Sequence, residues 1–171
     1  MNKTTTLTHE ESEFLICSNQ IEQEYGETAL TDAVAAWAYA KTVDVMTLEH
    51  VLEIHRLLMD RLNPRIAGKV RDCDVYIGGK RKIYISQALL KTEICDWCEA
   101  LITEKILGEE AHETIAKDMH VWFEGLHPFE DGNGRVGRIL YNWHRVKLGL
   151  PVHVIHPGKE QMEYYKWFKN N

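Results

Sequence analysis

Residues 127–138 read His127-Pro128-Phe129-Glu130-Asp131-Gly132-Asn133-Gly134-Arg135-Val136-Gly137-Arg138. A base, carboxylates, an amide between two glycines, and two arginines fall within this short stretch. Apolar residues at helical spacing lie on both sides of it. We therefore predict a loop that leads into a helix. Its composition suits a site for a phosphate ester and a metal ion.

Gly132, Asn133 and Gly134 are the candidates for holding phosphate. Consecutive backbone N–H groups at a helix start form a concavity that binds anions, and glycines let a phosphate approach closely. Asn133 tolerates the left-handed backbone that such a concavity needs, and it offers a side-chain amide. Taken without their neighbours, these residues would be interpreted as a glycine-rich turn with a helix cap.

Arg135 and Arg138 favour the anion-binding interpretation. Their spacing places both on one face at the start of a helix. Cations at that end oppose the helix dipole by about 0.3–1 kcal/mol each, so a sequence selected only for stability would carry acids there. We expect both guanidinium groups to bind an anion together with the backbone amides. A solvated pair on a surface turn is the alternative.

Asp131 and His127 flank this phosphate site. A carboxylate beside a phosphate needs a cation between the two, and Mg²⁺ held by one carboxylate, phosphate oxygens and water is the usual arrangement. Asp131 could instead cap the helix, and Glu130 could compete for either role. His127 precedes a proline, which favours an extended backbone. Its imidazole could accept a proton from an attacking hydroxyl, or simply cap a helix end.

The remaining sequence indicates one mainly helical domain. The 171 residues are 44% hydrophobic and carry a net charge of −6, which argues against nucleic acid or an anionic membrane as partner. No window resembles a signal peptide or a membrane span, so a cytoplasmic location is expected. A capping box at Thr8–Glu11 predicts a helix over about residues 8–24. Alternating β-formers around Gly78-Gly79 predict a hairpin over about residues 74–86.

The stretch 127–138 resembles the signature of the Fic family, His-Pro-Phe-x-[Asp/Glu]-Gly-Asn-Gly-Arg-x-x-Arg, at every specified position. The order of helices, hairpin and signature is similar to the family from about residue 10 to 168, and Gly68-x-x-Arg71 resembles the usual approach to its flap. The resemblance implies an all-α Fic-type helical bundle with one β-hairpin flap. A single domain would span residues 1–171, with the signature loop and its helix over 127–149.

The resemblance implies a protein adenylyltransferase that moves AMP from ATP, with Mg²⁺, to a Ser, Thr or Tyr hydroxyl of a target protein and releases pyrophosphate. The chain itself is one candidate target. In this scheme His127 is the general base, Asp131 holds Mg²⁺, and Arg138 reaches the γ-phosphate. The nucleotide and its phosphates would be bound by Gly132, Asn133, Gly134, Arg135, Arg138, Tyr164 and Tyr165. The two tyrosines suit core packing equally well.

In the family, the flap captures a target segment as an added strand. By resemblance, the docking edge would be formed by Val75, Tyr76 and Ile77. A small structural hairpin is the alternative, since exposed β edges are normally protected.

Ser18-Asn19-Gln20-Ile21-Glu22-Gln23 resembles the family's inhibitory motif, [Ser/Thr]-x-x-x-Glu-[Gly/Asn]. Ser18 and Glu22 lie on one helical face. The resemblance implies that Glu22 pairs with Arg138 and blocks the γ-phosphate. Gln23 departs from the motif, because Gly or Asn would end the helix in a left-handed turn whereas Gln23 can continue it. An exposed acid on an amphipathic helix is the alternative for Glu22.

Three other functions stay open on the same residues. The chain could remove AMP from a modified target, with Glu22 positioning water. It could transfer another nucleotide or phosphate group, although Gly134 disfavours a kinase-like branch that has Lys there. It could also be a nucleotide-responsive binding module, which would not need the base His127.

Overall fold

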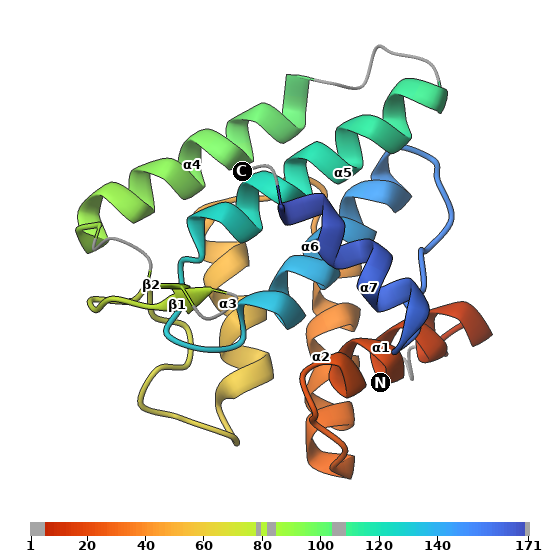
Figure 1. Cartoon of the computed structure of the whole chain (residues 1–171), viewed down its shortest axis with the longest axis horizontal. Coiled ribbons are helices and arrows are strands. Elements are labelled where there is room, and N and C mark those ends of the chain that lie inside the picture. The colour runs from red at the N-terminus through yellow and green to blue at the C-terminus, as the bar shows by residue number, and fades with distance from the viewer. Residues whose placement is uncertain (1–5, 78–79, 82–84, 104–108, 170–171) are drawn as a thin grey trace.

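The computed structural model describes residues 6–77, 80–81, 85–103 and 109–169 (Figure 1). Helices dominate these residues, as expected. In chain order they are α1 (His9–Ile21), α2 (Glu27–Thr42), α3 (Leu48–Met59), α4 (Gln87–Thr103), α5 (Glu109–Leu126), α6 (Asn133–Lys147) and α7 (Lys159–Tyr165), followed by the 3₁₀ turn η1 (Lys166–Phe168). The predicted all-α bundle is confirmed.

The predicted hairpin is present in part. Strand β1 (Tyr76–Ile77) pairs antiparallel with β2 (Lys80–Arg81), with Tyr76 opposite Arg81 and Ile77 opposite Lys80. The rest of the hairpin expected over residues 74–86 includes residues 78–79 and 82–84, which lie outside the described residues.

Helix α6 lies at the centre of the bundle. It contacts α1, α2, α3 and α5, and α4 packs on the outer side of α5 (Figure 1). Its buried residues run almost without interruption from Asn133 to Arg145. The largest fully buried side chains of the core around it include Trp37, Trp97, Phe123 and Phe129. Because α6 begins with the signature segment, its burial fixes that segment firmly.

Helix α1 begins with the predicted capping box. The Thr8 hydroxyl accepts from the Glu11 backbone N–H at 3.2 Å, and the Glu11 carboxylate accepts from the Thr8 backbone N–H at 2.9 Å. Glu11 also binds Lys41 of α2 at 2.8 Å. Phe14 packs edge-on against Trp37 with ring centroids 5.5 Å apart. Helix α1 is therefore anchored to α2 at its N-terminal half.

Helix α1 ends sooner than predicted, at Ile21 rather than near residue 24. Gln23 has a φ of +60°, in the left-handed region. The Gln23 N–H donates to Gln20 O at 3.0 Å and the Glu24 N–H donates to Asn19 O at 2.9 Å, which is the pattern of a Schellman motif. The expectation that Gln23 continues the helix is wrong, since Gln23 adopts the conformation that Gly or Asn would have.

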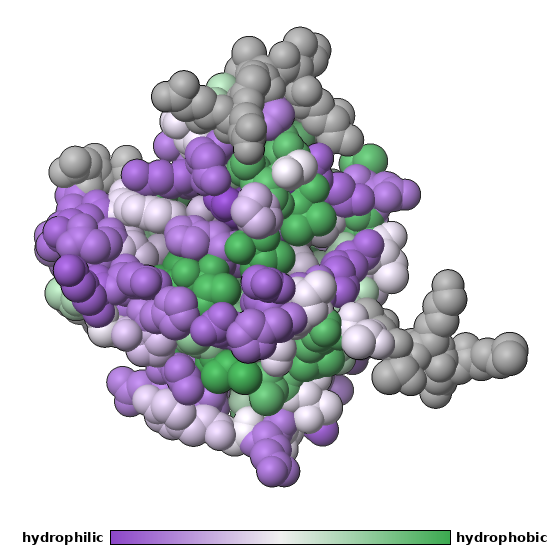
Figure 2. All heavy atoms as spheres, turned by 90° about the vertical axis from the view of Figure 1, so that its right-hand side faces the viewer, coloured by the Kyte–Doolittle hydropathy of each residue, from purple (hydrophilic) through white to green (hydrophobic). Residues whose placement is uncertain are grey.

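The outer surface is mixed in character. On the face shown in Figure 2, apolar side chains form several separate groups with hydrophilic side chains between them. Such scattered apolar surface is usual for a folded domain. Among the residues that the structure describes, no helix combines the length and the apolar character needed to cross a membrane.

Candidate functional site

A left-handed glycine makes the turn into α6. Gly132 has a φ of +79° and occupies the N-cap position. A Cβ atom there would lie 2.9 Å from Met59 Sδ, so both the backbone conformation and the packing against α3 require glycine. The loop before α6 is thereby pressed closely onto α3.

Asn133 has a different role from the one predicted. Its amide Oδ1 accepts from the Phe129 N–H at 2.8 Å, and its Nδ2 donates to the Phe129 carbonyl at 2.8 Å. The side chain is 3% exposed. Its amide is therefore used to close the loop upon itself, and Gly132 rather than Asn133 has the left-handed backbone. Only the backbone of Asn133 remains available to a phosphate.

His55 of α3 supports the same loop and was not predicted as a site residue. Its Nδ1 accepts from the Gly68 N–H at 2.9 Å, so Nε2 carries the proton and donates to the Asp131 carbonyl at 3.1 Å. The ring stacks on Phe129 at 3.8 Å. Burial lowers the pKa of His55 to about 4, so the ring is neutral. The sequence held one signal for this role, which was a polar histidine ring among the apolar residues on one face of α3.

His127 is held by its backbone. Its φ is +48°, so the expected extended conformation before Pro128 is wrong. Arg71 donates from Nε to the His127 carbonyl at 2.7 Å, and the Arg71 N–H donates to the Pro128 carbonyl at 2.9 Å. Arg71 is 2% exposed. The residues that follow Gly68 thus fix the left-handed turn that carries the candidate base.

Arg135 is a buried cation with spare donors. Its side chain is 3% exposed and donates from Nη2 to Met59 Sδ at 3.2 Å. Its Nε and Nη1 atoms are buried and have no hydrogen-bond partner among the described residues. Unpaired buried donors on a charged group are costly. An anion bound beside Arg135 would satisfy them.

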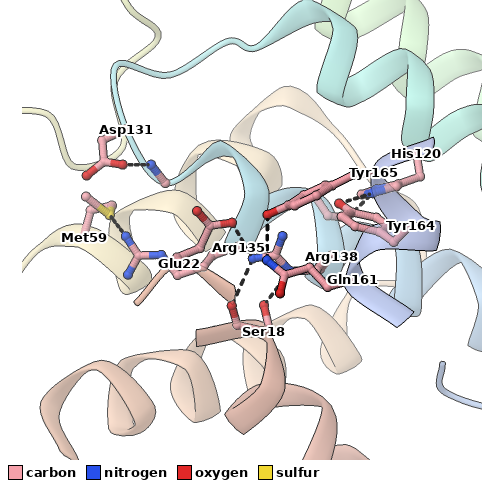
Figure 3. A network of polar contacts seen from close by, with 12 residues as sticks. Ser18, Glu22, Met59, His120, Asp131, Arg135, Arg138, Gln161, Tyr164 and Tyr165 are labelled. Carbon is pink, nitrogen blue, oxygen red and sulfur yellow. Dashed lines mark hydrogen bonds and ion pairs between the residues drawn. The ribbon is translucent and has the colours of Figure 1, made fainter. Parts of the chain in front are cut away.

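Arg138 is bound instead by α1. Its Nη2 donates to Glu22 Oε1 at 2.8 Å, its Nε donates to Ser18 Oγ at 2.9 Å, and Nη2 also donates to the Ser18 carbonyl at 3.0 Å (Figure 3). The Arg138 side chain is 3% exposed and that of Glu22 is 38% exposed. The ion pair implied by the resemblance is therefore present in the structure.

Glu22 covers the start of α6. A Cβ atom on Gly134 would collide with Glu22 Oε1 and would lie 2.9 Å from Arg138 Nη1. The carboxylate thus rests against the first turn of the helix, beside a guanidinium group. Backbone N–H groups and a cation at a helix start are the features that bind anions. The site predicted for a phosphate holds a carboxylate from the same chain.

Asp131 lies at the exposed mouth of the loop. Its Oδ1 accepts from the Gly132 N–H at 2.7 Å. Glu130, the competing acid, pairs with Arg65. The described residues contain no group of three or more metal-ligating side chains. This donor set fits a metal bound through one carboxylate with ligand oxygens and water, as Mg²⁺ is commonly bound.

The two candidate tyrosines differ in position. Tyr164 is 4% exposed and its hydroxyl donates to His120 Nε2 at 3.0 Å, while His120 Nδ1 donates to the Gly137 carbonyl at 3.1 Å. Tyr164 therefore packs in the interior, which was the alternative for it. Tyr165 is 40% exposed and its hydroxyl accepts from Gln161 at 2.9 Å. Figure 3 shows Tyr165 with its hydrogen bond to Gln161.

The flap residues also differ in exposure. Val75 is 5% exposed, so its side chain packs inward. Tyr76 is 70% exposed and Ile77 is 36% exposed. Of the three residues expected at the docking edge, only Tyr76 and Ile77 present their side chains outward.

The chain is similar in sequence to curated proteins of animals. Protein adenylyltransferase fic-1 of Caenorhabditis elegans is 32% identical over 134 residues, which cover 74% of this chain and 24% of that protein. Protein adenylyltransferase Fic of Drosophila willistoni is 29% identical over 149 residues, which cover 85% of this chain and 29% of that protein. The chain thus spans less than a third of the length of these curated relatives.

Solved structures share the fold. Fic-1 of C. elegans superposes with a TM-score of 0.78 at 19% identity and covers 98% of this chain and 58% of its own. A Fic domain containing signalling protein of Bacteroides thetaiotaomicron superposes with a TM-score of 0.76 at 19% identity, covering 92% of this chain and 70% of its own. The model of the Fic/DOC family matches residues 45–144, more than half of the chain and including the whole signature. The chain belongs to the Fic/DOC family.

Proposed function

We propose that this chain transfers AMP from ATP to a hydroxyl side chain of a target protein, and that Glu22 inhibits the transfer from within the same chain. The relatives named protein adenylyltransferase support the reaction. The single observation that carries the proposal is the position of Glu22. Its carboxylate lies on Gly134 and Arg138, where an anionic ligand has to bind.

The proposed phosphate site combines three kinds of donor. The backbone at Gly132, Asn133 and Gly134 begins α6, Arg135 brings two unpartnered buried N–H groups, and Arg138 would be released when Glu22 leaves. Together these groups would hold the phosphates and favour the charge that develops on the leaving pyrophosphate. Asp131 would hold Mg²⁺, which would supply further positive charge to the phosphates.

His127 would be the general base. Its imidazole would take the proton from the target hydroxyl as the hydroxyl oxygen bonds to the α-phosphorus. The bond from that phosphorus to the pyrophosphate oxygen breaks in the same displacement. The anchor from Arg71 to the His127 carbonyl would keep the ring in place, because positioning makes a large share of catalytic rate.

The flap would present the target. Tyr76 and Ile77 lie on β1 with exposed side chains, and a short strand can bind an extended segment through its backbone. Tyr165, which is exposed at the end of α7, would contact the nucleotide. The target protein would therefore be bound at the flap and its hydroxyl delivered to the α-phosphorus near His127.

Incubation with α-labelled ATP and Mg²⁺ tests the proposal. Wild type, Glu22→Gly, and Glu22→Gly with His127→Ala would be compared on cell lysate, with labelled protein as the readout. Glu24→Gly is the matched control, because it removes a nearby acid that is not hydrogen-bonded to Arg138. Label should rise in Glu22→Gly alone and disappear when His127→Ala is added. ATP binding without label in Glu22→Gly would refute AMP transfer.

A second function is favoured by the exposure of Glu22. At 38% exposed, its carboxylate can reach water beside Gly134, and could orient that water to remove AMP from a modified target. A target that already carries AMP, incubated without ATP, separates the two functions. Loss of AMP with wild type but not with Glu22→Gln would identify removal.

A further inference from the structure

His55 of α3 contacts the loop before α6 at three points. Its ring stacks on Phe129 with centroids 3.8 Å apart and the planes 2° from parallel. Its Nε2 atom lies 3.1 Å from the Asp131 carbonyl oxygen. A Cβ atom on Gly132 would lie 3.5 Å from His55 Cδ2, so the turn at Gly132 rests directly on the ring. His55 is fully buried, and it can therefore act on a bound ligand only through this loop.

The two ring nitrogens of His55 have different partners, and these partners fix the tautomer. The Gly68 N–H donates to Nδ1 at 2.9 Å, so Nδ1 carries no proton. The single ring proton is on Nε2, which donates to the Asp131 carbonyl. The ring thus joins the segment that leads to the flap with the loop that leads into α6.

The bond to the Asp131 carbonyl orients the whole Asp131–Gly132 peptide group. This peptide is trans, so its carbonyl and its N–H point in opposite directions within one plane. Because His55 holds the carbonyl end, the Gly132 N–H points away from the ring. That N–H donates to Asp131 Oδ1 at 2.7 Å (Figure 3). A hydrogen bond from His55 therefore determines where the Asp131 carboxylate is held.

We propose that His55 is a positioning residue for the metal ion, which holds the Asp131 carboxylate, through the Asp131–Gly132 peptide, in the orientation that binds Mg²⁺. The inference rests on the proposed function, because it takes Asp131 as the metal ligand.

Loss of the His55 bond would free this peptide to turn over. A peptide group rotates as a unit about the two bonds that flank it, and a flanking glycine makes the rotation easier. Turning the group over would point the Gly132 N–H toward α3 and leave Asp131 Oδ1 without its donor. A carboxylate without that donor has more freedom to lose when it binds an ion, so its affinity for Mg²⁺ should fall.

Two amide side chains separate the two bonds of the His55 ring. Asn has its amide oxygen as many bonds from Cβ as Nδ1 of histidine, so His55→Asn can keep the bond from Gly68 but loses the bond to Asp131. Gln has its amide nitrogen as many bonds from Cβ as Nε2 of histidine, so His55→Gln can keep the bond to Asp131. Both variants lose the stacking on Phe129. The difference between them therefore reports on the Asp131 carbonyl.

The first test needs no ligand. Amide hydrogen exchange at Gly132 and Gly68 would be followed by ¹H–¹⁵N NMR in the whole chain. His55→Asn should speed exchange at Gly132 by roughly tenfold, as expected for the loss of one hydrogen bond, and should leave Gly68 protected. His55→Gln should give the reverse pattern. Equal protection of Gly132 in the two variants would overturn the inference.

The second test measures the metal ion. In the Glu22→Gly background, ATP affinity would be measured by calorimetry with Mg²⁺ and with EDTA. His55→Asn should lower the affinity about tenfold with Mg²⁺, as expected when support for a metal ligand is lost, and should leave the affinity in EDTA unchanged. His55→Gln should restore most of the loss. His50→Asn is the matched control, because this histidine of α3 contacts Thr47 instead of the loop, and it should change neither affinity.

The outcomes separate this inference from the proposed function. An equal loss of affinity for His55→Asn in Mg²⁺ and in EDTA, or no loss in either, would overturn the positioning role. ATP affinity that does not depend on Mg²⁺ in the Glu22→Gly parent would overturn it too. A loss confined to Mg²⁺ would support the inference even if the parent transferred no label from ATP, and that absence of label would refute AMP transfer alone.

Discussion

Gln23→Gly should stabilise the protein, although it replaces a larger side chain with none. Gln23 has a φ of +60° and an exposed side chain. A residue with a Cβ atom in this conformation is disfavoured by roughly 1–2 kcal/mol. Replacement by glycine removes this strain and so raises the unfolding free energy by about that much, but the freer unfolded chain of glycine lowers it by roughly 0.5–1 kcal/mol. The net gain is about 0.5–1 kcal/mol, which for a chain of this size corresponds to a Tm increase of roughly 1–4 °C.

The matched control is Gln20→Gly, one turn earlier in α1. Gln20 lies within the right-handed helix, where glycine is unfavourable by about 0.5–1 kcal/mol. Thermal unfolding followed by circular dichroism should therefore give opposite shifts for the same chemical change. Gln23→Ala, which keeps the Cβ atom, should leave the Tm nearly unchanged. A lower Tm for Gln23→Gly would refute the left-handed assignment and the Schellman ending of α1.

Three other results are expected. Ser18→Ala removes the hydroxyl that accepts from buried Arg138 Nε, so it should lower the unfolding free energy in denaturant by about 1–3 kcal/mol. In the labelled-ATP assay it should also raise basal transfer, and unchanged basal transfer would contradict a role for Ser18 in inhibition. Asn133→Ala removes the amide that bonds to the Phe129 N–H and carbonyl, so it should lower the Tm by roughly 2–10 °C. A Tm equal to that of wild type would show that the loop closes without the amide. The unfolding free energy should fall as the pH is lowered from about 6.5 towards 4. Burial lowers the pKa of His55 and His144 to about 4 and that of His120 to about 3, so the unfolded chain binds protons that the folded chain does not. Urea titrations at pH 7, 6 and 5 measure this change, and an unfolding free energy that is the same at all three would contradict the burial of these rings.

The sequence predicted the elements well because their signals are local. The capping box at Thr8 and the apolar stripes depend on residues a few positions apart, and the family signature gave the order of the site residues. The end of α1 was missed for the opposite reason. Gln23 has no strong preference for a left-handed turn, but the chain must leave the helix there to begin α2 at Glu27. Tertiary structure overrides local propensity at such a position.

His55, the site residue that was missed, acts through a contact distant in sequence, because it meets the Asp131 carbonyl 76 positions later. Asn133 was predicted as a site residue, but its amide bonds to Phe129 within the loop rather than toward a ligand. A side-chain type predicts which bonds are possible but not which partner is nearest. Tyr164 and Val75 were assigned by resemblance alone, and their burial could be decided only by the packing of α7 and of the flap stem.

The bond between Glu22 and Arg138 joins residues 116 positions apart. During synthesis α1 leaves the ribosome before α6, so Glu22 cannot bind Arg138 until α6 has followed. In the proposed function, the same arginine binds the nucleotide phosphates. The inhibitory helix would therefore always be made before the part of the chain that it inhibits. A newly made chain would complete both at once, and no partly synthesised form would have a finished phosphate site before Glu22 had been made.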